Sequence, residues 1–258
     1  MLLLYFAVII NTLNMSTEPT LRNLSFIDHF DELRKRVVRC LSVFFIGFIV
    51  FYFFADHFLS ILRKPLFDYL PPDQQKLYFT HLFENFLTHL KIGAVASLFF
   101  LSPYYFYDLW AFVSPCLYQK ENKQALHFVL IATVFFLGGA SFAYFVLFPV
   151  GFKYFITYGS ATDVPLLTIS SYYSMCIKLL LLFGVAFELP VLICLLGVLG
   201  IVDAKTLKTQ RRTAIIFIAV ISALFAPPDA VSMLILGGPL YLLYEIAIVI
   251  VDWQGRRK

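Results

Sequence analysis

The sequence predicts an all-α integral membrane protein, a single bundle of six transmembrane helices with both termini in the cytoplasm. Hydrophobic residues make up 60% of the 258 residues and charged residues only 14%, whereas a soluble domain carries about 25% charged residues. Apolar stretches recur along the chain between polar or proline-rich segments, as is typical of spanning helices. An even number of spans puts both termini on the same side of the membrane.

The predicted membrane domain covers residues 25–253, between an N-terminal extension (1–24) and a basic C-terminal tail (254–258). Residues 1–10 are apolar but too few to span a bilayer, and they lack the basic region and cleavage site of a signal peptide. The six predicted spans lie at approximately 37–55, 92–113, 125–149, 172–199, 213–226 and 230–251.

Lysine and arginine assign the termini to the cytoplasm. The segments on the side of the termini carry 14 basic residues and the opposite segments carry five, and an excess of basic residues marks the cytoplasmic side. The remaining basic residue, Lys178, falls in the fourth span, where we expect its ammonium group to reach toward the outer interface.

An interfacial helix is predicted before the first span. Ser25 followed by Asp28 forms a capping box, and Phe26, Leu33 and their neighbours at helical spacing give one apolar face. The opposite face carries Glu32 among basic residues. Such a helix lies along the membrane and holds a carboxylate at the cytoplasmic surface.

The fifth and sixth spans are predicted to be short. The 14 residues between Arg212 and Pro227 rise only about 21 Å in a helix, less than the roughly 30 Å hydrocarbon core. The sixth span is equally short if Glu245 marks its cytoplasmic edge. This hairpin therefore either thins the bilayer locally or does not cross it fully.

The sequence shows no catalytic machinery. It contains no Gly-rich phosphate loop, HExxH or GxSxG motif, and its four cysteines form no CxxC pair. We therefore expect no enzyme activity, no cofactor and no metal site, and no nucleic-acid partner.

Glu188 is the most unusual residue, because a carboxylate inside an apolar span is costly unless it is paired, protonated or facing water. Pro190 follows it and removes the helical donor to the Ala186 carbonyl, which predicts a kink. Either Glu188 makes an internal hydrogen bond that holds the bundle together, or it offers a polar site to a partner helix or substrate. We favour the second interpretation.

Four other polar or proline positions have ordinary structural explanations. Glu121 is a loop charge between the second and third spans, and Glu32 pairs with Arg36 at i+4. Asp229 caps the sixth span, and Pro65 bends an outer segment.

Several strings, taken together and in order, resemble the TatC family, the core receptor of the twin-arginine protein translocase. The strings are HFDELRKR (29–36), KPL (64–66), WAFVSPCLYQKE (110–121), FAYFVLFP (142–149), FGVAFELPV (183–191), APPDAVS (226–232) and YEI (244–246). The resemblance implies a concave, cup-like bundle of six helices whose fifth and sixth spans are short.

The resemblance also implies a function and partners. It implies a receptor in the bacterial cytoplasmic (inner) membrane that binds signal peptides with a consecutive Arg pair. It implies assembly with the single-span proteins TatA and TatB, in a complex that holds several copies of the chain. Transport of folded proteins would then be driven by the proton-motive force.

The resemblance assigns roles to individual residues. Glu32 and Glu121 match the acids associated with twin-arginine recognition, Arg34 the neighbouring basic position, and Phe112 an aromatic residue of the same loop region. Arginine suits two such acids, because a planar guanidinium pairs bidentately with a carboxylate and lysine does not.

Other residues match structural or assembly positions. Glu188 matches an intramembrane acid on the concave face, Pro65 an outer-loop proline and Asp229 the acid of the last outer loop, and Glu245 belongs to the YEI string. Lys178 departs from the pattern, because we expect an uncharged residue there.

A small-solute transporter or proton channel that uses Glu188 and Lys178 is the main alternative. It predicts pseudo-symmetry between the two halves, and no inverted repeat is evident in the sequence. A purely structural scaffold is a third possibility.

Overall fold

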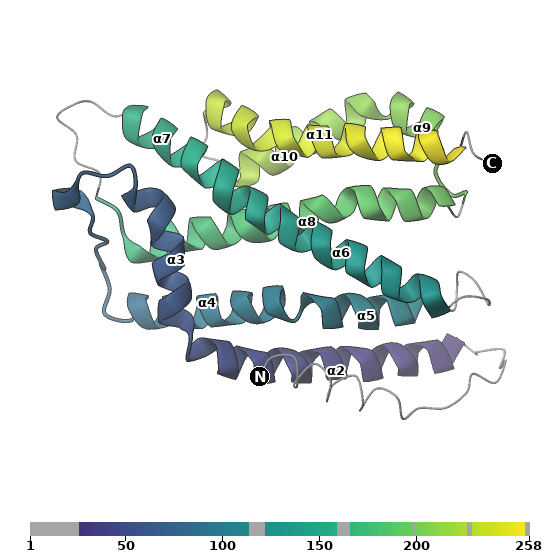
Figure 1. Ribbon diagram of the computed structural model, residues 1–258, viewed down its shortest axis with the longest axis horizontal. Coiled ribbons are helices and arrows are strands. Elements are labelled where there is room, and N and C mark those ends of the chain that lie inside the picture. The colour runs from purple at the N-terminus through teal and green to yellow at the C-terminus, as the bar shows by residue number, and fades with distance from the viewer. Residues whose placement is uncertain (1–25, 114–121, 159–165, 199, 226–228, 256–258) are drawn as a thin grey trace. The chain divides into compact units, whose positions relative to one another are not determined.

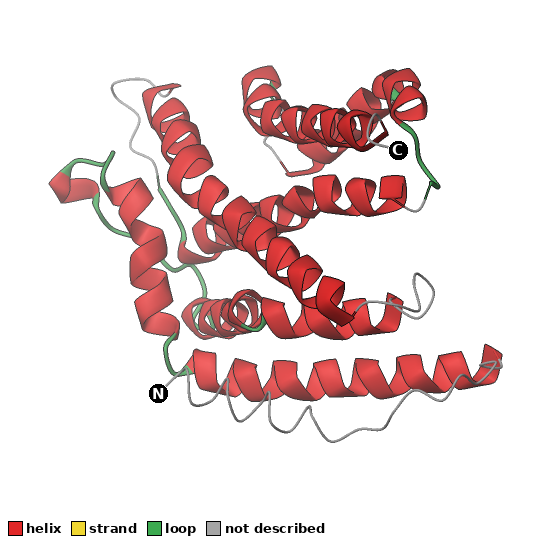
Figure 2. Cartoon of the chain, turned by 45° about the vertical axis from the view of Figure 1, so that its right-hand side comes forward, coloured by secondary structure: helices red, strands yellow, loops and turns green. Residues whose placement is uncertain are grey.

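The computed structural model describes residues 26–113, 122–158, 166–198, 200–225 and 229–255. Within these ranges the structure is helix and loop (Figure 2), apart from one isolated bridge between Tyr78 and Thr168. The chain divides into two compact units, Met1–Val38 and Arg39–Lys258.

The helices follow one another as labelled in Figure 1. They are α2 (Phe26–Tyr52), α3 (Ala55–Phe67), the short η1 (Pro72–Gln74), α4 (Glu84–Phe100), α5 (Ser102–Val113), α6 (Asn122–Phe142), the π-turn η3 (Ala143–Leu147), α7 (Phe148–Tyr158), α8 (Ile169–Val198), α9 (Ala204–Thr209), α10 (Arg211–Phe225) and α11 (Ala230–Gly255).

Three helical stretches are long and apolar enough to cross a membrane: Phe128–Ile156, Ile169–Gly197 and Ala230–Trp253. Two bent pairs also qualify if each is one span, α2 with α3 at 74° and α4 with α5 at 56°, which gives up to five. The predicted fifth span is α10, a helix of only 15 residues. The sixth is different, because α11 has 26 residues and continues past Glu245 to Gly255.

The third predicted span continues beyond its expected end at residue 149. Helix α6 passes through η3 into α7, which ends at Tyr158. Pro149 lies just after the π-turn, where the regular ladder of backbone hydrogen bonds is already rearranged. A proline without an N–H is tolerated there, so it does not end the helix.

The second unit is built around α8. One cluster of buried residues joins α8 to α3 and α7 through Leu59, Phe148 and Tyr173. A second cluster joins α8 to η3 and α11 through Phe183 and Leu240. Helix α8 is continuous through Pro190.

Pro65 lies inside α3 and deprives the Ile61 carbonyl of its helical donor. The hydroxyl of Tyr144, on η3, donates to that carbonyl at 2.8 Å. The hydroxyl of Tyr172, on α8, donates to the carbonyl of the next residue, Leu62, at 2.6 Å. The proline therefore frees the Ile61 carbonyl, and that carbonyl and its neighbour at Leu62 bind α3 to η3 and α8.

Glu84, at the start of α4, is 6% exposed and joins two segments of the chain. Its Oε2 accepts hydrogen bonds from the Thr80 amide at 2.7 Å, the Thr80 hydroxyl at 3.0 Å and the His81 amide at 3.3 Å. Its Oε1 accepts from the amide of Ser170, on α8, at 2.5 Å. The carboxylate satisfies donors that would otherwise be buried without partners.

Glu84→Gln is expected to lower the melting temperature of the purified chain by roughly 5 °C, because an amide nitrogen cannot accept these hydrogen bonds. Thermal unfolding in detergent measures the change. Asp56→Asn is the matched control, since the Asp56 side chain is 91% exposed and its contact is a surface pair with His89. Equal shifts for the two variants would contradict the role given to Glu84.

Candidate functional site

Glu32 and Arg36 form the predicted pair on α2, within the first unit. Arg36 donates to Oε1 of Glu32 from Nε at 3.1 Å and from Nη2 at 2.5 Å. Both side chains are partly buried, whereas Arg34 is exposed. The acid of the HFDELRKR string therefore already binds a guanidinium group in this structure.

For the other two residues of the expected signal-peptide site, Glu121 and Phe112, the structure describes only the backbone of Phe112. Glu121 lies outside the described residues. Phe112 lies in the last turn of α5, and its side chain is outside the described part. The juxtaposition of these residues with Glu32 stays a prediction.

Asp108 on α5 is a buried carboxylate that the sequence reasoning missed, with 3% of its side chain exposed. Arg39 Nη1 lies 3.5 Å from its Oδ1, and Cys40 Sγ donates to its Oδ2 at 3.2 Å. The signal was available, because Asp108 falls in the predicted span 92–113 and an ionisable residue inside a span marks a polar site.

Glu188 is 8% exposed on α8. Its Oε1 has no hydrogen-bond partner among the described residues. It lies where α8 packs closely against α6, as shown by the contact of Gly184 with the Phe136 ring. Lys178 is exposed on the same helix, and no ion pair joins it to Glu188 within the described ranges.

Asp229 has the geometry of the predicted N-cap of α11. Its Oδ2 accepts from the Ser232 amide at 2.7 Å, and its carbonyl accepts from the Met233 amide at 3.1 Å. The bond from the Ser232 amide holds the pKa of Asp229 below its usual value. This explains Asp229 without a ligand.

Glu245 joins two helices rather than standing alone. It accepts hydrogen bonds from Arg211 Nη2, at the start of α10, and from the Tyr241 hydroxyl, each at 2.7 Å. The pair fixes the end of α10 against α11, which suits the structural role predicted for Glu245.

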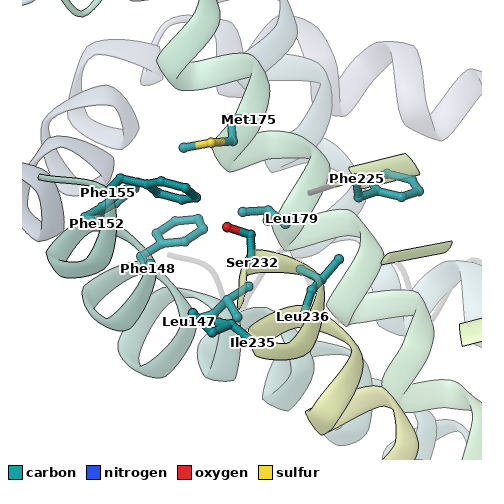
Figure 3. Close-up of a pocket in the computed structure, with 11 residues that line it drawn as sticks. Leu147, Phe148, Phe152, Phe155, Met175, Leu179, Phe225, Ser232, Ile235 and Leu236 are labelled. Carbon is teal, nitrogen blue, oxygen red and sulfur yellow. The ribbon is translucent and has the colours of Figure 1, made fainter. Parts of the chain in front are cut away.

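Two apolar cavities lie among the last helices. The first, of about 50 Å³, lies between α7, α8, α10 and α11 and contains the Ser232 hydroxyl (Figure 3). The second, of about 560 Å³, lies between α10 and α11 beside Ser222. Neither lining includes a charged side chain, and no group of His, Cys, Asp or Glu in the described part is arranged to hold a metal ion.

These helices define a multi-pass membrane protein in which two buried carboxylates, Glu84 and Asp108, join separate segments of the chain. Residues 28–239 match the family model described as Sec-independent protein translocase protein (TatC). The chain belongs to the TatC family of protein translocase subunits.

Relatives and solved structures agree with this assignment. The TatC protein of Desulforapulum autotrophicum is 37% identical over 90% of this chain and 86% of its own. The TatC protein of Campylobacter jejuni is 36% identical over 87% of this chain and 92% of its own length. A crystal structure of the twin arginine translocase receptor TatC matches with a TM-score of 0.78 at 30% identity, covering 87% of this chain and 98% of that one.

Proposed function

We propose that this chain binds signal peptides that carry a consecutive Arg pair, as the receptor and core subunit of a twin-arginine translocase. The observation that supports this most directly is the pairing of Glu32 with Arg36. It places a guanidinium against the carboxylate through two hydrogen bonds, the kind of contact that an incoming arginine would make.

Both bonds from Arg36 end on Oε1 of Glu32. A carboxylate has lone pairs for about four hydrogen bonds, so Oε2 offers further acceptor positions to an arginine of the signal peptide. Glu121 supplies the second carboxylate, and Phe112 packs against the peptide beside it. Arg34 provides the basic position beside the first of these acids.

Glu188 is proposed to meet a polar group of a signal peptide or partner helix inside the bilayer. Its buried oxygen without a partner among the described residues supports this interpretation over a purely internal hydrogen bond, since an unpaired buried oxygen is unfavourable. Pro65, Asp229 and Glu245 keep the segments around the site in place.

The proposed topology is a cup-like bundle of six spans, including the short α10, with both termini in the cytoplasm of a bacterial cell. TatA and TatB are its proposed partners in the inner membrane, several copies of the chain assemble, and the proton-motive force drives transport of folded cargo. The receptor itself performs no chemical catalysis.

A photoreactive Arg-Arg signal peptide is expected to crosslink to residues 112–121 of this chain in membranes, and a Lys-Lys version at least about tenfold less. Lysine is a point charge that cannot make the bidentate contact. Crosslink yield, measured by mass spectrometry, tests the proposal.

Two outcomes would contradict the recognition model: equal labelling by the Lys-Lys peptide, and labelling unchanged by Glu121→Ala. The transporter alternative is tested separately. Uptake of a small solute by liposomes that contain only the purified chain would favour it.

A further inference from the structure

Lys178 and Lys91 form a basic pair beside one contact between α4 and α8. Lys91 Nζ, on α4, donates to the hydroxyl of Ser174, on α8, at 3.2 Å. Lys178 follows Ser174 by four residues, so the two side chains share a face of α8 at a Cβ separation of about 6 Å. Both lysines are exposed, and both ammonium groups can reach one ligand beside Ser174.

The pair has no acidic partner among the described residues. Glu84 is the carboxylate on the same interface, and its oxygens are occupied by the Thr80, His81 and Ser170 donors. It also precedes Lys91 by seven residues, about 10 Å along the helix. Lys178 lies in an apolar span, and its ammonium group reaches toward the membrane interface on the side of Lys91, in α4. Since no acid in the described part pairs with either lysine, an anion at this place would come from outside the chain.

The surroundings of the pair are exposed apolar side chains. Leu87 lies one turn before Lys91 on α4, and Phe83 lies two turns before it, immediately before the helix begins. Their side chains are 51% and 70% exposed. Leu82 and Phe86 beside them are 84% and 52% exposed. Lys178 falls within the apolar stretch Ile169–Gly197. Cationic groups next to exposed apolar side chains match a phospholipid, which has an anionic headgroup and apolar chains.

We propose that Lys91, Lys178 and Ser174 bind the phosphate of an anionic phospholipid in the leaflet opposite the termini. The lysines pair with the phosphate, the serine hydroxyl donates a hydrogen bond to it, and Phe83 and Leu87 contact the acyl chains. This lipid site is independent of signal-peptide binding, so either proposal can fail without the other.

The test is binding of phosphatidylglycerol and of phosphatidylcholine to the purified full chain, followed by native mass spectrometry. The unsubstituted chain is expected to retain one phosphatidylglycerol at concentrations at which phosphatidylcholine dissociates. Lys91→Gln with Lys178→Gln is expected to weaken binding roughly thirtyfold, about fivefold for each lysine. Lys91→Arg with Lys178→Arg should keep the preference.

The matched control is Lys64→Gln with Lys153→Gln, which removes the same charge from two exposed lysines on α3 and α7. The control should bind phosphatidylglycerol within twofold of the unsubstituted chain. Melting temperatures in zwitterionic detergent verify that all variants are folded. If the double Gln variant does not fold, the double Arg variant is compared with the unsubstituted chain instead.

Four results would overturn the proposal. They are equal retention of both lipids, an equal loss in the control pair, displacement of the lipid by millimolar inorganic phosphate, and crosslinks from a photoreactive residue at position 178 that go to a partner protein instead of lipid.

Discussion

Replacing Glu32 and Glu121 together by glutamine is expected to weaken binding of an Arg-Arg signal peptide at least about 1,000-fold and to stop export of its cargo. Removing one partner of a hydrogen-bonded charge pair costs about 2–5 kcal/mol, which is roughly thirtyfold or more at each site. Binding of a fluorescent signal peptide to the purified chain measures the first effect. Appearance of folded cargo outside the cytoplasm measures the second.

Asp31→Asn is the control for this experiment, because Asp31 is an exposed carboxylate beside Glu32 on α2. It should leave peptide binding within twofold. If the control weakened binding as much as the double substitution, the effect would be general negative charge rather than recognition by two particular acids.

Gly139→Ala is expected to destabilise the protein by about 3 kcal/mol, whereas Gly138→Ala should be neutral or slightly stabilising. A Cβ at position 139 would overlap the Phe183 carbonyl oxygen, and it would lie 2.8 Å from the carbonyl carbon and 2.9 Å from Phe187 Cβ. Backbone atoms of α8 cannot move aside as a side-chain tip can, so the helices must separate. Thermal or denaturant unfolding in detergent measures the difference.

The neighbouring glycine supplies the control within the same helix turn. A Cβ at position 138 meets nothing within 4 Å, and alanine is favoured over glycine in a helix by about 1 kcal/mol. Equal destabilisation by the two substitutions would show that α6 does not pack on α8 through Gly139.

The local part of the site could be predicted from sequence. The Glu32–Arg36 pair and the Asp229 cap join residues three or four apart, and both are confirmed. Helix geometry alone brings such residues together. The same reasoning found the short α10, because its polar boundaries are visible in the sequence.

The long-range part could not be predicted. Glu84 meets Ser170 across 86 positions, and Cys40 meets Asp108 across 68. Hydropathy shows that a charged residue falls in or near a span, but it does not identify the donor that will face it. Lys178 shares its helix face with Ser174, which Lys91 contacts from α4, and that contact depends on how the two helices pack.

The sequence by itself determined the class of protein, its family and two of the contacts between residues close in the chain, the Glu32–Arg36 pair and the Asp229 cap. These follow from composition, periodicity and ordered motifs, which act over a few residues. The tertiary structure decided the rest: that Tyr144 replaces the donor lost at Pro65, that Glu84 joins α4 to α8, and that Gly139 must remain small. The physical reason is that inside a bundle each buried polar group needs a partner, and helix packing selects which distant residue supplies it.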